Sequence, residues 1–121
     1  MAVRRRIDPE AGRAAVRAVQ ADSPETSDLA TATRFLLEEL ASAYEGHTVE
    51  VRVPPYGAAQ AIAGPRHTRG TPPNVVETDP VTWIALATGS LSWAEATATA
   101  RIAASGSRAD LSQELPLAWD S

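Results

Sequence analysis

The segment Asn74–Leu115 decides the fold and reads NVVETDPVTWIALATGSLSWAEATATARIAASGSRADLSQEL. Asp79 followed by Pro80 is an N-cap with proline at the first helical position, where the missing N–H costs no hydrogen bond. Gly89 is placed to end that helix in the left-handed conformation. We therefore expect a strand over Asn74–Thr78, followed by a helix from Pro80 to Gly89.

A second helix, a further strand and a third helix are expected in the rest of this segment. Ser92 and Glu95 have the spacing of a capping box, in which each side chain accepts a backbone N–H at the start of the helix. The alanine-rich helix that they begin gives way to a short strand, Ile102–Ser105. Over about Ser107–Leu115 we expect another helix, which Pro116 ends.

Two helices are expected before this segment. Asp8 and Pro9 repeat the N-cap and proline pattern, and they begin a helix that runs to about Gln20. After a linker, a longer helix runs to about Tyr44. The stripe predicted to face a sheet recurs with the period of an amphipathic helix. It consists of Leu29, Thr33, Leu36, Leu37, Leu40 and Tyr44.

Two strands are expected between that helix and Asn74. Over Thr48–Val53, valine alternates with Glu50 and Arg52, which is typical of a half-buried antiparallel strand. Pro54 and the proline after it end the strand, since proline cannot donate to the ladder. Alanine dominates the second strand, Tyr56–Ala63, and its small side chains let a helix approach closely or leave room for a ligand.

The helix that begins at Asp79, the Thr-Gly turn, the second helix and the Ala-Arg-Ile strand together resemble the second half of the sterol carrier protein fold. The match covers roughly Gly46–Leu115. The stretch VRVPPYGAAQAIAGPRHTRGTPPNVVETDPVTW (51–83) resembles the actinobacterial branch of that family, the bacterial sterol carrier orthologue, and PRHTRGTPPNVVETDP (65–80) is its most specific part. The resemblance implies an α+β domain with a curved, mostly antiparallel sheet of about five strands. Helices would cover one face of the sheet, with an apolar cavity between the layers. Eukaryotic relatives bind fatty acyl chains, acyl-CoA and sterols.

Length and composition favour one globular unit. The chain has 121 residues, of which 44% are hydrophobic, enough for a single core. We interpret residues 1–22 as a charged tip and a helix, and residues 23–121 as a single sterol-carrier-like domain. The formal net charge of −4 disfavours nucleic acid and anionic membranes as general partners.

The chain has no cysteine, which excludes disulfides, thiol nucleophiles and thiolate metal sites. No run reaches the roughly 18 apolar residues of a membrane span, and the basic start lacks the apolar core of a signal peptide. We therefore expect no stable membrane insertion, and a cytoplasmic location.

An apolar ligand is expected between the helices and the sheet. The alternative for the same side chains is a filled core, and for the tryptophans core packing competes with a place at the mouth of the cavity. The residues predicted to line the cavity are Leu36, Leu40, Val51, Val53, Trp83, Leu86, Trp93 and Ile102.

The loop 64–73 is the one basic spot in this acidic sequence. Arg66 and Arg69 are candidates to bind the phosphate or carboxylate of a ligand head group through bidentate donors. The alternative is that they pair with Glu77 or Asp79 and fix the loop.

Neither a metal site nor a cofactor is expected. His47 and His67 are the only histidines, and their spacing does not suggest a metal site. Nucleophile-elbow, dinucleotide and phosphate-loop signatures are missing. A Ser-His-Asp triad stays open, since its members need only meet in space.

The leading hypothesis is a non-enzymatic carrier for a fatty acyl or sterol-like molecule. The alternative is a structural or interaction module with a filled core, which forms a homodimer or binds a protein partner. Trp119 lies in a polar stretch after Pro116 and is expected to be exposed, as a contact for such a partner.

Overall fold

The computed structural model describes residues 5–22, 25–64 and 74–120. The elements in chain order are α1 (Pro9–Gln20), α2 (Thr26–Ala43), β1 (Val49–Val53), β2 (Gly57–Ala61), β3 (Asn74–Thr78), α3 (Pro80–Thr88), α4 (Trp93–Ala98) and β4 (Ile102–Ser105). The strands form one open sheet in the order β2-β1-β3-β4. The predicted α+β class is confirmed, but the described part of the chain has four strands rather than about five.

The sheet combines antiparallel and parallel pairs. β1 is antiparallel to β2 and parallel to β3, and β3 is antiparallel to β4. The alternation predicted for β1 is confirmed, because Val49, Val51 and Val53 are buried while Glu50 and Arg52 are half-buried on the other face. β1 and β3 therefore form the centre of the sheet, and β2 and β4 form its edges.

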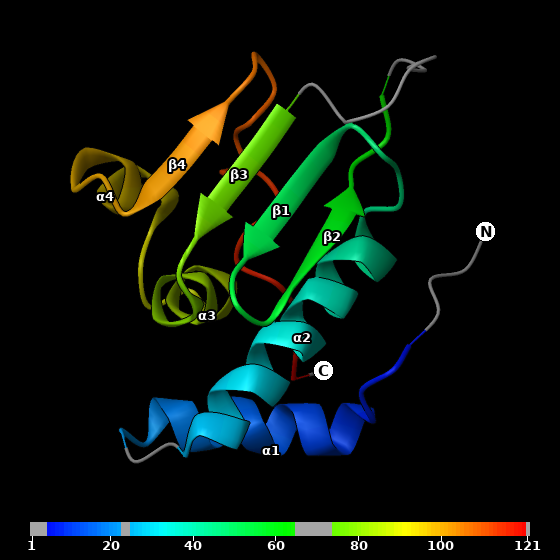
Figure 1. Ribbon diagram of the computed structural model, residues 1–121, viewed down its shortest axis with the longest axis vertical. Helices are drawn as coiled ribbons and strands as arrows, with labels where there is room; N and C mark the ends of the chain where they lie inside the picture. The colour runs from blue at the N-terminus through cyan, green and yellow to red at the C-terminus, as the bar shows by residue number, and fades with distance from the viewer. Residues whose placement is uncertain (1–4, 23–24, 65–73, 121) are drawn as a thin grey trace.

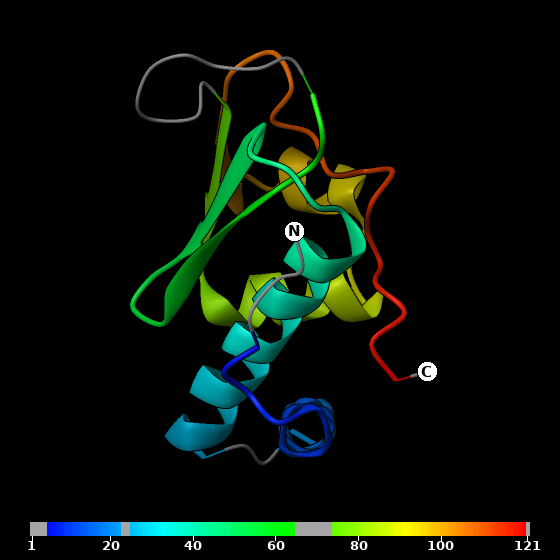
Figure 2. The same ribbon diagram turned by 90° about the vertical axis from the view of Figure 1, so that its right-hand side faces the viewer.

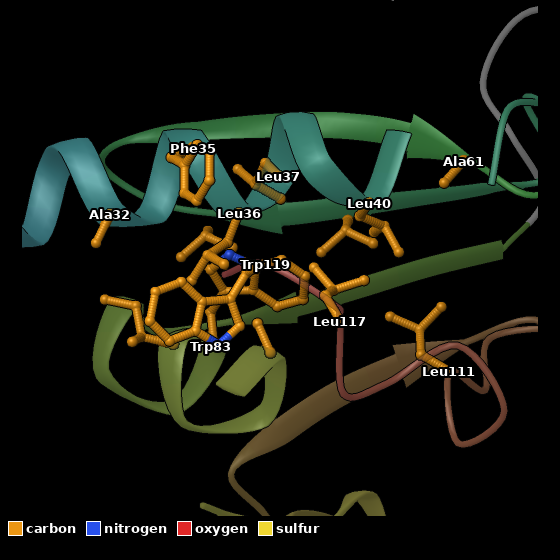
Figure 3. Close-up of a cluster of buried hydrophobic side chains, with 14 of the residues drawn as sticks. Ala32, Phe35, Leu36, Leu37, Leu40, Ala61, Trp83, Leu111, Leu117 and Trp119 are labelled. Carbon is orange, nitrogen blue, oxygen red and sulfur yellow. The ribbon is translucent and has the colours of Figure 1, made fainter. Parts of the chain in front are cut away.

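The helices lie on one side of the sheet. Figure 1 looks onto the other face, which no described helix covers, and the turned view of Figure 2 shows the sheet at the left with α2 and α3 to its right. Phe35, Leu36 and Leu40 of α2 are fully buried, and so are Val51 and Val76 of the sheet. As predicted, α2 is the chief cover of the sheet, and the core lies between these two layers (Figure 3).

Three of the helices, α1, α3 and α4, begin at an N-cap whose side chain accepts a backbone hydrogen bond. The Asp8 carboxylate accepts from Ala11 N–H at 3.1 Å at the start of α1. The Asp79 carboxylate accepts from Thr82 N–H at 2.8 Å at the start of α3. At α4, Glu95 N–H donates to Ser92 Oγ at 3.1 Å, which completes the predicted capping box.

The helix predicted over Ser107–Leu115 is wrong. The structure has turns there, with a single i to i+4 bond from Leu115 N–H to Leu111 C=O at 3.1 Å. Ala109 and Leu111 are both buried, although residues two apart point to nearly opposite sides of a helix. Arg108 N–H donates instead to the side chain of Asn74 at 2.9 Å. Burial of both side chains therefore favours a non-helical path.

Trp119 is buried, which corrects the prediction that it is exposed. Only 8% of its surface is accessible, and it belongs to the main hydrophobic cluster with Leu117. The guanidinium of Arg17 in α1 lies 5.7 Å from the centre of its ring system. Leu117 N–H donates to Ala87 C=O of α3 at 2.9 Å. The C-terminal segment thus completes the core and does not present Trp119 to a partner.

Candidate functional site

Most residues predicted to line a cavity lie in the packed core. Leu36, Leu40, Val51, Val53 and Trp83 all belong to one cluster of buried side chains and are at most 1% exposed. The close-up of this cluster shows Leu36 and Trp83 between α2 and α3, and Leu40 beside Leu117 (Figure 3). A ligand in contact with these side chains would have to open the cluster, so their role as ligand contacts stays a prediction.

Two predicted residues line the same pocket. Leu86 of α3, which is only 2% exposed, and the half-buried Trp93 of α4 line a pocket of about 350 Å³, which we call the α3–α4 pocket. Its lining is mainly apolar. It consists of Leu86, Gly89, Leu91, Ser92, Trp93, Ala94, Ser112, Leu115 and Pro116.

The turn between α3 and α4 shapes this pocket. Gly89 ends α3 with φ of 89°, a left-handed conformation that glycine adopts without strain. Leu91 N–H then donates back to Ala85 C=O at 3.2 Å, which fixes the turn. The capping box begins α4 directly afterwards and places Trp93 in its first turn. The C-terminal segment closes the pocket from the other side with Pro116.

The structure does not bring Ile102 to the same place. Ile102 begins β4 and lines a different hollow of about 350 Å³, which also includes Pro54, Asp79 and Arg101. It is half-buried beside Thr78, its partner in the β3–β4 register. Arg66 and Arg69 lie outside the described residues, and so does His67. Their predicted head-group role stays a prediction.

A larger groove lies between α2 and β2, and we call it the α2–β2 groove. Its volume is about 520 Å³. Its lining consists of Arg6, Ile7, Arg34, Leu37, Glu38, Ala41, His47, Tyr56, Gly57, Ala58, Ala59 and Gln60. The small side chains of β2, which the sequence suggested would let a helix approach or leave room for a ligand, pack near α2 and line this groove. The other parts of the groove were not predicted, because they come from segments far apart in the sequence.

Polar contacts hold the walls of this groove. Arg34 Nε donates to Tyr56 C=O at 2.9 Å, and its guanidinium lies 5.7 Å from the centre of the Tyr56 ring. His47 Nδ1 and Gln60 Oε1 are 2.7 Å apart. Glu38 accepts from the backbone N–H of Arg6 at 3.0 Å, and from the next N–H at 3.2 Å. The Glu38 carboxylate is thus engaged, while the guanidinium of Arg34 faces no described carboxylate within ion-pair distance.

The open face of the sheet carries a half-buried charge pair, Arg52 and Glu50. Arg52 donates to Glu50 at 3.3 Å, and this hydrogen bond, together with the charge of Glu50, raises the pKa of Arg52. Arg52 stays protonated at neutral pH in any case. In the described part of the chain, no three histidine and acidic side chains lie together as a metal site would require.

Comparison with known proteins places this fold in a family. Residues 25–117 match the family model described as "Bacterial SCP ortholog". A search of curated proteins found none that matches the chain. Among the described residues, no helix is both long and apolar enough to cross a membrane. Because the matched residues make up more than half of the sequence, this chain belongs to the bacterial branch of the sterol carrier protein family.

Proposed function

We propose that the chain is a non-catalytic carrier that binds an apolar small molecule of the fatty acyl class. The observation that carries this proposal is the α3–α4 pocket, where Leu86 and Trp93, both predicted as ligand contacts, lie beside Leu91 and Leu115. Membership of the family supports it, since the eukaryotic relatives of this bacterial branch bind acyl chains and sterols. We infer that the apolar part of the ligand rests against Trp93.

The size and the lining of the pocket favour a slender ligand. A volume of about 350 Å³ is at the lower end of the range of small-molecule pockets, about 300–1,000 Å³. An acyl chain suits this space better than the four fused rings of a sterol. Among the described residues, no charged side chain lines the pocket, so the head group would lie outside it. Arg66 and Arg69 remain the proposed contacts for an acidic head group.

A blocking variant tests this site. Ala94 is exposed, lines the pocket and lies in α4, so Ala94→Arg fills the mouth without disturbing the core or the helix. Ala98→Arg is the matched control, because Ala98 is exposed on the same short helix and does not line the pocket. Displacement of a fluorescent fatty acid by laurate measures binding, and circular dichroism checks folding.

We expect Ala94→Arg to weaken laurate binding by about tenfold or more, as the loss of a well-packed apolar contact implies. Ala98→Arg should bind laurate as the unmodified protein does. Equal binding by all three proteins would place the ligand elsewhere. A failure of the unmodified protein to bind any fatty acid would overturn the carrier proposal.

The packed core favours a second candidate, a structural or interaction module. Leu36, Leu40, Val51 and Val53 have no accessible surface, as a filled core requires. In this case the protein would act through its outer surface and would need no ligand. Light scattering across a range of concentrations tests self-association. The mass of a monomer at every concentration would rule out a homodimer, and an interaction module would then need a different protein as its partner.

A further inference from the structure

The α2–β2 groove runs along a free edge of the sheet, separate from the α3–α4 pocket. β2 pairs with β1 alone, so one side of its backbone has no strand partner in the described chain. Five consecutive residues, from Tyr56 to Gln60, line the groove from this edge. An unpaired edge of this kind is a template for the addition of another strand.

The register shows which backbone groups face outward. Thr48, the residue before β1, donates its N–H to Ile62 C=O at 3.1 Å. In an antiparallel pair the inward groups alternate, so Gln60 and Ala58 turn their N–H and C=O toward β1. Ala59 and Gly57 then turn theirs away from β1, toward the side on which a further strand would lie.

The groove has space and an apolar floor for such a strand. Leu37 and Ala41 of α2 form part of the lining, opposite the small residues Gly57 and Ala59. A Cβ added at Gly57 would lie 3.5 Å from Leu37 Cδ1, so α2 supports the strand from below without covering its edge. Side chains of an added strand that point toward α2 would bury apolar surface against this floor.

A positively charged guanidinium, that of Arg34, lies at one end of the groove. Arg34 is fixed beside the start of β2 by its hydrogen bond to Tyr56 C=O. Its Nη atoms stay available for a carboxylate, which guanidinium groups bind through two parallel hydrogen bonds. A strand that runs antiparallel to β2 ends at the start of β2, and its terminal carboxylate would therefore lie at Arg34.

We propose that the α2–β2 groove binds the C-terminal segment of a protein partner as an extended strand, antiparallel to β2, with its terminal carboxylate at Arg34. The free backbone groups favour a peptide, because an acyl chain cannot supply alternating donors and acceptors. This inference does not depend on ligand binding at the α3–α4 pocket. The two proposals can therefore fail independently.

The probe is a library of random hexapeptides displayed with free C-termini, selected on the full chain. Ala59→Pro removes one outward N–H and leaves the β1 ladder intact, since proline is tolerated at an edge. Arg34→Gln removes the proposed carboxylate contact. Arg101→Gln is the matched control, because Arg101 is exposed and lies at β4, outside the groove. Thermal unfolding checks that each variant is folded.

We expect selected peptides to lose about tenfold or more in affinity on Arg34→Gln, and by a similar factor when their terminus is an amide. In Arg34→Gln the amide should cause no further loss. Ala59→Pro, or N-methylation of alternate peptide bonds, should abolish binding, while Arg101→Gln should leave it unchanged.

The proposal is overturned if no peptide is enriched, or if enriched peptides bind folded Ala59→Pro as tightly as the unmodified protein. It is also overturned if laurate binds the groove in a manner sensitive to Arg34→Gln while no peptide does. That result would make the groove an amphiphile site.

Discussion

Trp83 in α3 donates its indole N–H to the backbone C=O of Thr33 in α2, at 3.3 Å, inside the core. Both residues are at most 1% exposed. The bond joins the two helices that cover the sheet, and it satisfies the one polar group of the largest buried side chain. The hydroxyl of the same Thr33 is buried and has no hydrogen-bond partner among the described residues.

Thr33→Val should raise the free energy of unfolding by about 1 kcal/mol, because it replaces an unpaired buried hydroxyl by a methyl group of similar size. Thr82→Val is the matched control, since Thr82 is also buried but its hydroxyl donates to Asp79 at 2.9 Å. Urea unfolding should show a gain for the first variant and a loss for the second. Equal losses would mean that the Thr33 hydroxyl is satisfied.

Gly12→Ala should destabilise the protein, although alanine favours a helix interior by about 1 kcal/mol. A Cβ at Gly12 would lie 2.7 Å from Phe35 Cβ and would overlap the Phe35 ring, so α1 could not stay as close to α2. Adding Phe35→Leu to Gly12→Ala should recover part of the loss in a double-mutant cycle. Strict additivity of the two changes would argue against this contact.

Asn74→Asp should cost about 2–3 kcal/mol of unfolding free energy, because it removes a buried donor and faces a carboxylate toward a carbonyl oxygen. Asn74 Nδ2 donates to Thr48 C=O at 2.9 Å, and Oδ1 accepts from Arg108 N–H at 2.9 Å. The amide thus fixes the loop after β4 to the start of the sheet. Chemical denaturation measures the cost, and an unchanged midpoint would show that this link is dispensable.

Trp119→Ala should cost about 3–5 kcal/mol, the usual penalty for truncating a large buried side chain. Val81→Ala, at a position that is 56% exposed, should change stability by no more than about 0.5 kcal/mol. Thermal unfolding of both variants makes the comparison. If Trp119→Ala stayed fully stable but changed the mass in solution, Trp119 would be an interface residue after all.

The sequence predicted the elements whose signals are local. Asp79 with Pro80, and Ser92 with Glu95, start their helices as expected, because an N-cap depends on a few adjacent backbone groups. The alternation of valines in β1 predicted its buried face, because side chains alternate along any strand.

Contacts between distant segments could not be predicted in this way. Ala109, Leu111, Leu117 and Trp119 are buried at odd positions, a spacing that suits an extended segment. The prediction of a helix that Pro116 ends did not take this spacing into account. The α2–β2 groove combines Ile7, α2 and β2, and no single stretch of sequence contains that arrangement.

Of the residues predicted as ligand contacts, only Leu86 and Trp93 line the same pocket among those found in the described part of the chain. The others were chosen because they are apolar and face inward, and this criterion also selects ordinary core residues. Periodicity identifies a buried face, but it does not tell whether a ligand or another side chain covers that face.

Native mass spectrometry with added laurate is the most direct test of ligand binding at the α3–α4 pocket. We expect a one-to-one adduct on the unmodified protein and on Ala98→Arg. On a folded Ala94→Arg, whose added side chain fills the mouth of the pocket, the affinity measured from the adduct should fall by about tenfold or more. An unmodified protein that stays free of laurate, or an adduct of undiminished affinity on Ala94→Arg, would contradict a carrier with its site in this pocket.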